Sequence, residues 1–315
     1  MDVLSKIYVE TTTFCNLSCE MCVQRVWDES PGAMSLETFA DLMTQVSAMP
    51  TPPIIHFGGY GEPMVHPHII EMVRLAKATG AQVEMTTNGM MLTRERADAL
   101  FELQLDKLVV SVDGVTPESY SDIRVNGDLD RVIQNLRYLQ GLKLRKVGRH
   151  AKPQFALAFV AMKSNINELP DLAKLASYLG AWEVKVSNVV PHTPEMEAEI
   201  LYEQALRAAS FRESRWAVNM SLPRMDINSN TVDTLQDVYD SRVSMSLMGT
   251  SWSEKTNYCR FAQEGYIAIR MDGEVSPCLS LLHTHPEYIH GRDRTVHHQS
   301  FGNIPEASLE DICTG

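Results

Sequence analysis

The chain has 315 residues, and 44% of them are hydrophobic, which is enough to bury a large core and excludes a disordered protein. Its formal net charge of −12 opposes a nucleic-acid partner, because affinity for nucleic acid depends on Lys and Arg side chains that neutralise phosphates. No run approaches the ~18 apolar residues of a membrane span, and the amino terminus lacks a secretory signal. We therefore expect a cytoplasmic protein without a membrane partner.

Short β-rich runs alternate with longer amphipathic stretches from residue 6 onward. The predicted strands cover residues 6–11, 54–58, 82–87, 108–113, 154–162 and 182–188. The predicted helices cover residues 35–48, 66–79, 93–104, 128–140, 167–179 and 195–213. Ser35, Thr93 and Asn167 are predicted helix caps, and Pro117 after Thr116 marks another helix start. This alternation predicts an α/β fold with a parallel sheet and right-handed crossovers.

Three of the six cysteines, Cys15, Cys19 and Cys22, lie in the sequence CNLSCEMC directly after the first predicted strand. In a reducing cytosol, clustered cysteines indicate metal binding or catalysis more often than disulfides. Three thiolates on one loop can hold three corners of an iron-sulfur cube, which leaves one iron open for a substrate or cofactor. A zinc knuckle is the alternative, but it needs a fourth ligand, and no Cys or His lies nearby in the sequence.

The C-x3-C-x2-C spacing resembles that of the radical S-adenosylmethionine (SAM) enzymes, and the later strand-end motifs follow the order of that family. The resemblance implies a partial (β/α)6 TIM-type barrel, whereas periodicity alone leaves an open sheet as an alternative. It also implies a 4Fe-4S cluster that cleaves SAM to a 5′-deoxyadenosyl radical for hydrogen abstraction. In either fold the site lies at the carboxyl ends of the strands. Met21 departs from the family's usual aromatic residue, although a polarizable Met can make the same contact.

The sequence GGYGEP, residues 58–63, follows the second predicted strand and resembles the family motif that binds the SAM ammonium. Glycines permit close backbone approach, and Glu62 offers an acceptor to a cation. The family match further implies that Ser111 and Arg124 contact the SAM carboxylate and ribose; without it, Arg124 reads as a solvated helix residue. Asn88 in TTNG is either a ribose contact or a turn residue. The expected SAM-binding residues are Gly59, Tyr60, Gly61, Glu62, Asn88, Ser111 and Arg124, with residues 187–190 as a weaker prediction beside adenine.

The alternation fades after residue 214, which predicts a core domain at residues 1–214, a linker or irregular segment at 215–258 and a third region at 259–315. A β-hairpin with Asp-Gly at its turn is predicted between Cys259 and Cys278. This region resembles the start of a SPASM or twitch extension, which implies that these two cysteines hold an auxiliary iron-sulfur cluster; core thiols are the alternative. Cys313 is predicted to be a helix residue. Because this ligand set is incomplete, we expect that the chain is cut short.

Histidines are frequent after Cys278. They could complete a metal shell, but a solvated polar segment is favoured for this group, which comprises His283, His285, His290, His297 and His298. His66, His68 and the Trp27-Asp28 pair could line the site or have ordinary loop roles.

Residues 26–29, 159–170 and 186–196 resemble SPASM-type maturases associated with tungsten-containing oxidoreductases. The resemblance implies a peptide, protein or cofactor-precursor substrate, for example a tungsten oxidoreductase, and a low-potential electron donor such as ferredoxin or flavodoxin in an anaerobic cytosol. Alternatives are a ribosomal-peptide maturase, a formylglycine-forming maturase, an enzyme of molybdopterin assembly, and a non-enzymatic iron-sulfur or zinc carrier. The set of Glu62, Ser111 and Arg124 favours an enzyme, because a carrier has no need of SAM contacts.

Overall fold

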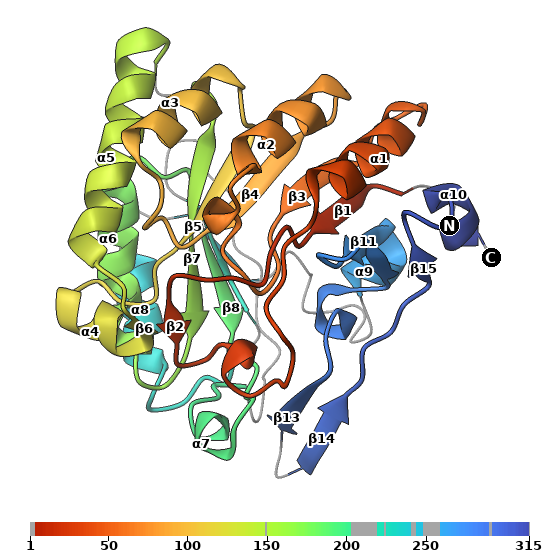
Figure 1. The fold of residues 1–315 in the computed structure, drawn as a ribbon. Helices are drawn as coiled ribbons and strands as arrows, with labels where there is room; N and C mark the ends of the chain where they lie inside the picture. Colours follow the sequence, from red (N-terminus) through yellow and green to blue (C-terminus); the bar gives the residue numbers. More distant parts are fainter. Residues whose placement is uncertain are drawn as a thin grey trace.

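The computed structural model describes residues 4–148, 150–202, 219–223, 225–240, 244–247, 259–289 and 292–314. Within these residues one sheet has eleven strands in the order β10-β9-β8-β7-β5-β4-β3-β1-β11-β12-β15 (Figure 1). The six predicted strands form its centre and pair in parallel, as predicted. They are β1 (Lys6–Val9), β3 (Ile54–Phe57), β4 (Val83–Thr87), β5 (Lys107–Ser111), β7 (Gln154–Ala161) and β8 (Glu183–Asn188).

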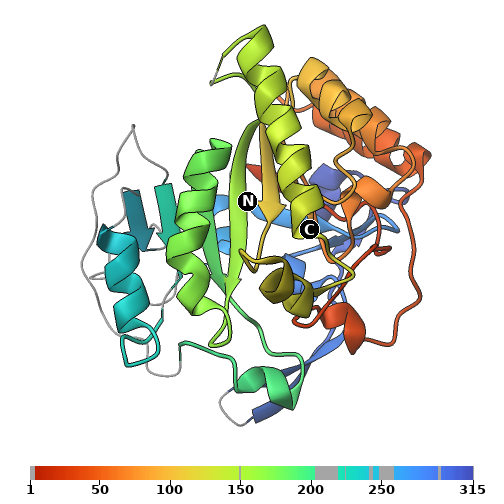
Figure 2. The same ribbon diagram turned by 90° about the vertical axis from the view of Figure 1, so that its left-hand side faces the viewer.

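The predicted helices follow these strands and cover one face of the sheet (Figures 1 and 2). They are α1 (Leu36–Ser47), α2 (Ile69–Ala78), α3 (Arg94–Glu102), α5 (Leu129–Lys146) and α6 (Leu169–Leu179), with the short α4 (Pro117–Ile123) before α5. Alternate apolar residues of each strand point toward the helices, and Phe57 of β3 packs against Phe39 of α1 with ring centroids 5.6 Å apart. This layer of strand and helix side chains forms the main hydrophobic core.

Most of the predicted helix caps are confirmed. The Ser35 and Thr93 side chains accept bonds from backbone N–H groups in the first turns of α1 and α3, and Thr116 forms a capping box before α4. The prediction for Asn167 is wrong. Helix α6 starts one residue later without a side-chain cap, because the Asn167 Oδ1 atom instead accepts a 2.9 Å hydrogen bond from Thr234.

The sheet extends beyond the sixth predicted strand. Strand β9 (Asn219–Leu222) pairs in parallel with β8, α8 (Val232–Asp240) follows, and β10 (Ser244–Leu247) pairs in parallel with β9 (Figure 2). The prediction of an irregular segment is therefore wrong for these three elements. Of the predicted helix at 195–213, the structure shows α7 (Pro194–Glu197). The prediction is wrong for residues 198–202, which are not helical, and residues 203–213 lie outside the described residues.

The carboxyl-terminal region joins the barrel through its first strand. Strand β11 (Tyr266–Ile269) pairs in parallel with β1, with Lys6 opposite Tyr266, and β12 (Glu274–Ser276) pairs antiparallel with β11. The predicted hairpin is thus confirmed, and Gly273 at its turn has φ +93°, which glycine adopts readily. The region continues with β13 (His285–Ile289), β14 (Arg292–Val296), β15 (Gly302–Asn303) and α10 (Leu309–Thr314).

Helix α10 contains Cys313, which confirms its prediction as a helix residue. The other short elements are β2 (Ser18–Cys19), β6 (Arg124–Val125), α9 (Arg260–Glu264) and the 3-10 turns η1 (Val23–Arg25), η2 (Pro63–Val65), η3 (Ile166–Glu168) and η4 (Leu279–Leu281). In the part of the chain that the structure describes, no helix is both long and apolar enough to span a bilayer.

Candidate functional site

The three clustered cysteines lie on the loop that follows β1. Within this loop β2 pairs antiparallel with β6, which sets Cys19 opposite Arg124. The backbone N–H of Cys22 donates to the Cys19 carbonyl at 3.0 Å, and the N–H of Leu17 donates to the Cys15 Sγ atom at 3.5 Å. The cysteine loop, residues 15–22, is therefore held by hydrogen bonds within the loop and by strand pairing with the segment after α4.

The three thiols share one environment. Burial raises the pKa of Cys15 and Cys22 and raises that of Cys19 to about 11, while the Arg124 charge opposes the shift at all three. Among the described residues no three metal-binding side chains converge on a single ion. A cube does not require such convergence, because each cysteine binds its own iron. Three soft sulfur donors on one loop fit an iron-sulfur cluster, and metal binding would displace their protons.

The GGYGEP loop packs directly on the backbone that leads into the cysteine loop. A Cβ atom at Gly61 would lie 2.0 Å from the Thr12 carbonyl oxygen, so only glycine fits there. The N–H of Glu62 donates to the Phe14 carbonyl at 2.9 Å. Gly59 is also constrained, because its Cβ atom would lie 2.7 Å from the Glu10 side chain. These glycines thus hold the predicted ammonium-binding loop against the cysteine loop.

Glu62 connects this loop to the TTNG turn after β4. Its carboxylate accepts hydrogen bonds from the Thr87 hydroxyl at 2.6 Å, the Asn88 N–H at 2.6 Å and the Met64 N–H at 2.9 Å. Burial raises the pKa of Glu62, and these three bonds oppose that rise. The Oε2 atom accepts only one of the three bonds, so it retains capacity for a further donor. Binding of a cation by Glu62 stays a prediction.

The Asn88 side chain is engaged within the protein. Its Nδ2 atom donates to the Asn16 Oδ1 atom at 2.9 Å, and its Oδ1 atom accepts from the Met90 N–H at 2.9 Å. Asn88 therefore braces the cysteine loop and closes its own turn. The predicted ribose contact would have to add to these bonds and stays a prediction.

Arg124 is buried, so its reading as a solvated helix residue is wrong. Its Nη2 atom lies 2.6 Å from Asp113, whose side chain is fully buried, and its Nη1 atom lies 3.7 Å from the Cys19 sulfur. Burial opposes the guanidinium charge, but Asp113 outweighs this effect and the pKa of Arg124 is raised. The buried Nε atom has no hydrogen-bond partner in the described part of the chain. A fixed positive charge with a spare donor therefore faces the cysteines.

Ser111 ends β5 and is half-buried. It lies two residues before Asp113, at the carboxyl edge of the sheet where the cysteine and glycine loops also lie. The sequence marked Asp113 only as part of SVDG and gave no reason to expect that it would orient Arg124. The interactions of Arg124 within the protein do not test the predicted binding of SAM by Ser111 and Arg124, which stays a prediction.

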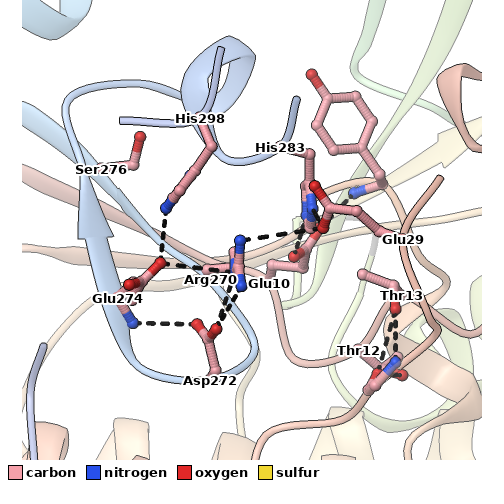
Figure 3. A network of polar contacts seen from close by, with 12 residues as sticks. Glu10, Thr12, Thr13, Glu29, Arg270, Asp272, Glu274, Ser276, His283 and His298 are labelled. Carbon is pink, nitrogen blue, oxygen red and sulfur yellow. Dashed lines mark hydrogen bonds and ion pairs between the residues drawn. The ribbon is translucent and has the colours of Figure 1, made fainter. Parts of the chain in front are cut away.

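Two of the five histidines after Cys278 are buried, so the prediction of a solvated segment is wrong for His283 and His285. The ring of His283 contacts Glu10 through Nε2 at 2.8 Å and Glu29 through Nδ1 at 2.6 Å (Figure 3). Burial lowers the pKa of His283, but the two carboxylates outweigh it and raise that pKa overall. These carboxylates come from the first thirty residues, which is why a local reading of the sequence missed the contact.

The other histidines differ in their surroundings. His298 lies 2.6 Å from Glu274, as Figure 3 shows, His297 is exposed, and His290 lies outside the described residues. The His66 Nε2 atom donates to the Met34 backbone carbonyl at 2.9 Å, an ordinary structural role. His68 precedes α2 without a side-chain cap.

Trp27 and Tyr60 pack around His283. Their rings lie 4.3 Å and 5.8 Å from the His283 ring, and 5.5 Å from each other. The backbone N–H of Tyr60 donates to Glu10 at 3.1 Å. Burial raises the pKa of Tyr60, and the charges of Glu10, Cys278 and Cys22 act in the same direction. Tyr60 in this aromatic cluster therefore lies within electrostatic reach of both Cys22 and Cys278.

Cys259 and Cys278 both begin short helical turns, α9 and η4. Cys259 is exposed and Cys278 is half-buried. Burial is the main cause that raises the pKa of Cys278, and the Cys259 thiol adds to it, so the two side chains lie within electrostatic reach of each other. The β11–β12 hairpin lies between these two cysteines in the chain, and their role in holding an auxiliary cluster stays a prediction.

Family models match both regions of the chain. A model of the radical SAM superfamily matches residues 9–151, and a model of the SPASM iron-sulfur cluster-binding domain matches residues 259–315. The tungsten-containing aldehyde ferredoxin oxidoreductase cofactor-modifying protein of Pyrococcus furiosus is 33% identical over 98% of this chain and 80% of its own length. Mycofactocin maturase MftC of Mycobacterium tuberculosis is 30% identical, over 55% of this chain and 41% of its own length.

Solved structures show the same fold at low sequence identity. SuiB of Streptococcus suis, bound to its precursor peptide SuiA, has a TM-score of 0.68 and 14% identity, over 98% of this chain and 64% of SuiB. The anSMEcpe protein with bound AdoMet has a TM-score of 0.66 and 16% identity, over 98% of this chain and 81% of its own. The chain thus spans less than two thirds of SuiB and of MftC. Its similarity over nearly its whole length to the Pyrococcus protein, together with the two domain matches, shows that the chain belongs to the radical SAM superfamily of SAM-dependent iron-sulfur enzymes and carries a SPASM-type region.

Proposed function

We propose that this protein is a radical SAM maturase that acts on a tungsten-containing oxidoreductase or on its cofactor. The observation that carries the radical chemistry is the cysteine loop, which the pairing of β2 with β6 places beside Arg124. The glycine loop packs on the backbone that leads into it. The choice of a tungsten enzyme rests on the name of the Pyrococcus furiosus relative, which matches 98% of this chain.

The bound cluster and SAM would supply one-electron cleavage of SAM to a 5′-deoxyadenosyl radical. The residues of the chain would bind and orient them. Cys15, Cys19 and Cys22 would hold three irons, while Arg124 would place a fixed positive charge beside the cluster. The Arg124 Nε donor and the Glu62 Oε2 acceptor would face the carboxylate and ammonium of SAM, respectively. Both side chains are already fixed by buried contacts, so little ordering would be needed on binding.

Anaerobic reconstitution tests this function. The protein would be loaded with iron and sulfide, mixed with SAM and dithionite, and assayed for 5′-deoxyadenosine. We expect the nucleoside from the wild-type protein and none from Cys19→Ala, because loss of one thiolate opens a second iron. An iron-loaded wild-type protein that forms no nucleoside, or one that contains zinc as its only metal, would instead support the carrier hypothesis.

A peptide substrate is the second candidate. Mycofactocin maturase MftC and the PqqA peptide cyclase of Gluconobacter oxydans match 55% and 58% of this chain. The two candidates are separated by adding either a tungsten oxidoreductase with its cofactor, or a precursor peptide, to the reconstituted enzyme. We expect the oxidoreductase or cofactor to change mass and to stimulate formation of 5′-deoxyadenosine. A mass change in the peptide alone would favour the second candidate.

We also propose that the protein works in the cytoplasm with ferredoxin or flavodoxin as its electron donor. Replacement of dithionite by reduced ferredoxin or flavodoxin tests the donor, and formation of 5′-deoxyadenosine with either protein is the expected result.

A further inference from the structure

The face of the sheet opposite the helices carries several charged side chains. Lys6 of β1 lies 2.6 Å from Glu84 of β4, and Lys107 of β5 lies 2.7 Å from Glu183 of β8. His56 of β3 also contacts Glu84 at 3.0 Å. Closed barrels usually fill this space with branched apolar residues, so charged pairs here indicate a polar interior.

A third lysine on this face is Lys185 of β8, whose side chain has no hydrogen bond or ion pair with any residue that the structure describes. The two glutamates nearby already pair with Lys6 and Lys107. Burial is the main cause that lowers the pKa of Lys185 to about 8, and repulsion from Lys107 adds to it. Burial also lowers the pKa of His56 to about 4, so His56 is neutral near pH 7. Among these described side chains, three lysines therefore face two glutamates.

The register of the sheet places Lys185 beside the predicted SAM site. Ser111 pairs with Ala158 of β7, and Ala158 pairs with Lys185, so Ser111 and Lys185 share one face two strands apart. Two strand spacings correspond to about 10 Å. Along β8, Val184 and Val186 are buried toward the helices, whereas Lys185 is partly exposed and Ser187 is exposed. Solvent thus reaches the inner face beside Lys185.

We infer that Lys185 binds an anionic group, a carboxylate or a phosphate, of the substrate. This inference rests on the proposed function and adds the chemistry of the substrate to it. A partly buried ammonium that has no anionic partner among the described residues is incompletely compensated, and an anionic ligand would balance its charge. A lysine suits this task because its ammonium acts as a point charge on a flexible stem.

The position of Lys185 favours a substrate group over the SAM carboxylate. Arg124 is an expected contact of the SAM carboxylate or ribose, and it lies opposite Cys19 of the cysteine loop. Strand β7 separates Lys185 from β5, the strand of Ser111. A substrate that enters between the SAM site and β8 would present its anionic group to Lys185 and its reacting carbon to SAM.

Equilibrium dialysis tests the inference on the reconstituted, SAM-bound holoenzyme under anaerobic conditions. The probes are radiolabelled inorganic phosphate and radiolabelled acetate. We expect at least one probe to bind the wild-type protein and to bind Lys185→Gln about tenfold more weakly, a difference of about 1.4 kcal/mol. Lys185→Arg, which keeps the charge, should retain binding. Glu183→Gln should strengthen it, because that change removes a competing negative charge.

Lys174→Gln is the matched control, because Lys174 is exposed on α6 and pairs only with Asp171 there. It should bind the probe as the wild-type protein does. Circular dichroism and iron content would establish that each variant is folded and loaded. The preference between phosphate and acetate identifies the anionic group.

Equal probe binding by the wild-type protein and Lys185→Gln would overturn the inference, as would a wild-type protein that binds SAM but neither probe. A third contradicting result is loss of SAM affinity in Lys185→Gln together with displacement of the probe by SAM. The last result would assign Lys185 to the SAM carboxylate. Formation of 5′-deoxyadenosine by the wild-type protein is measured separately, so failure of the proposed function is distinguishable from failure of this inference.

Discussion

Replacement of Asp113 by Asn tests the buried pair that orients Arg124. Both side chains are almost inaccessible to solvent, with exposures of 0% for Asp113 and 10% for Arg124, and their ion-pair atoms are 2.6 Å apart. Asn keeps the shape and the Oδ1 acceptor that receives the Val160 N–H at 2.7 Å, so the change removes mainly the charge. A buried arginine without its partner costs about 3–5 kcal/mol, because the desolvated charge is no longer compensated.

This cost should lower the unfolding temperature of the holoenzyme by roughly 5–10 °C in an anaerobic thermal scan. The double variant Asp113→Asn with Arg124→Gln should recover much of the loss, because no unpaired charge remains. Asp171→Asn, which removes a partner of exposed Lys174, should stay close to the wild-type temperature. If Asp113→Asn unfolds at the wild-type temperature, or the two changes simply add, the buried pair does not hold Arg124 as described.

Three further predictions concern the loops and the carboxyl-terminal region. The Gly61→Ala variant should lose most of its bound iron, because the added Cβ atom overlaps the Thr12 carbonyl oxygen. The control variant Gly141→Ala should keep its iron, because the added Cβ atom there meets only a flexible arginine side chain. Equal iron contents in the two variants would contradict this prediction. The pKa of His283 is raised in the folded protein, so protonated His283 stabilises the fold. This contribution to the free energy of unfolding is fully present below the ordinary histidine pKa of 6.5 and is lost as the pH rises through the folded-state pKa. The difference in unfolding temperature between the wild-type protein and His283→Gln should therefore shrink from pH 6 to pH 9, and a constant difference would argue against a charged His283. Cys278→Ala should contain less iron yet still cleave SAM; an unchanged iron content would make Cys278 structural.

Local signals in the sequence predicted the features that depend on neighbouring residues. The six central strands, the caps at Ser35 and Thr93 and the hairpin at Gly273 each follow from residues close in the chain. The cysteine loop was recognised for the same reason, since its three cysteines lie within eight residues, and their role as cluster ligands stays a prediction.

Features that depend on distant contacts could not be predicted. Asn167 looks like a helix cap, but Thr234 engages it from a segment 67 residues away. His283 looks like part of a polar loop, yet Glu10 and Glu29 bury it against the barrel. Strands β9 and β10 add to an existing sheet edge, so pairing supplies an order that their Asn- and Ser-containing sequences do not indicate.

Contacts between distant residues also involve the predicted SAM-binding side chains. The sequence marked Glu62, Asn88 and Arg124 as ligand-binding residues, and the structure shows that each also makes buried contacts within the protein. These contacts join the glycine loop, the TTNG turn and the cysteine loop. The residues are therefore held in place by one another as well as by any ligand.

The most direct test of the central claim is the EPR spectrum of the anaerobically reduced, reconstituted protein with and without SAM. If the cluster held by Cys15, Cys19 and Cys22 has an open iron that binds SAM, the spectrum of the reduced cluster in the wild-type protein changes when SAM is added. A reduced 4Fe-4S signal that is identical in the two samples would contradict the account.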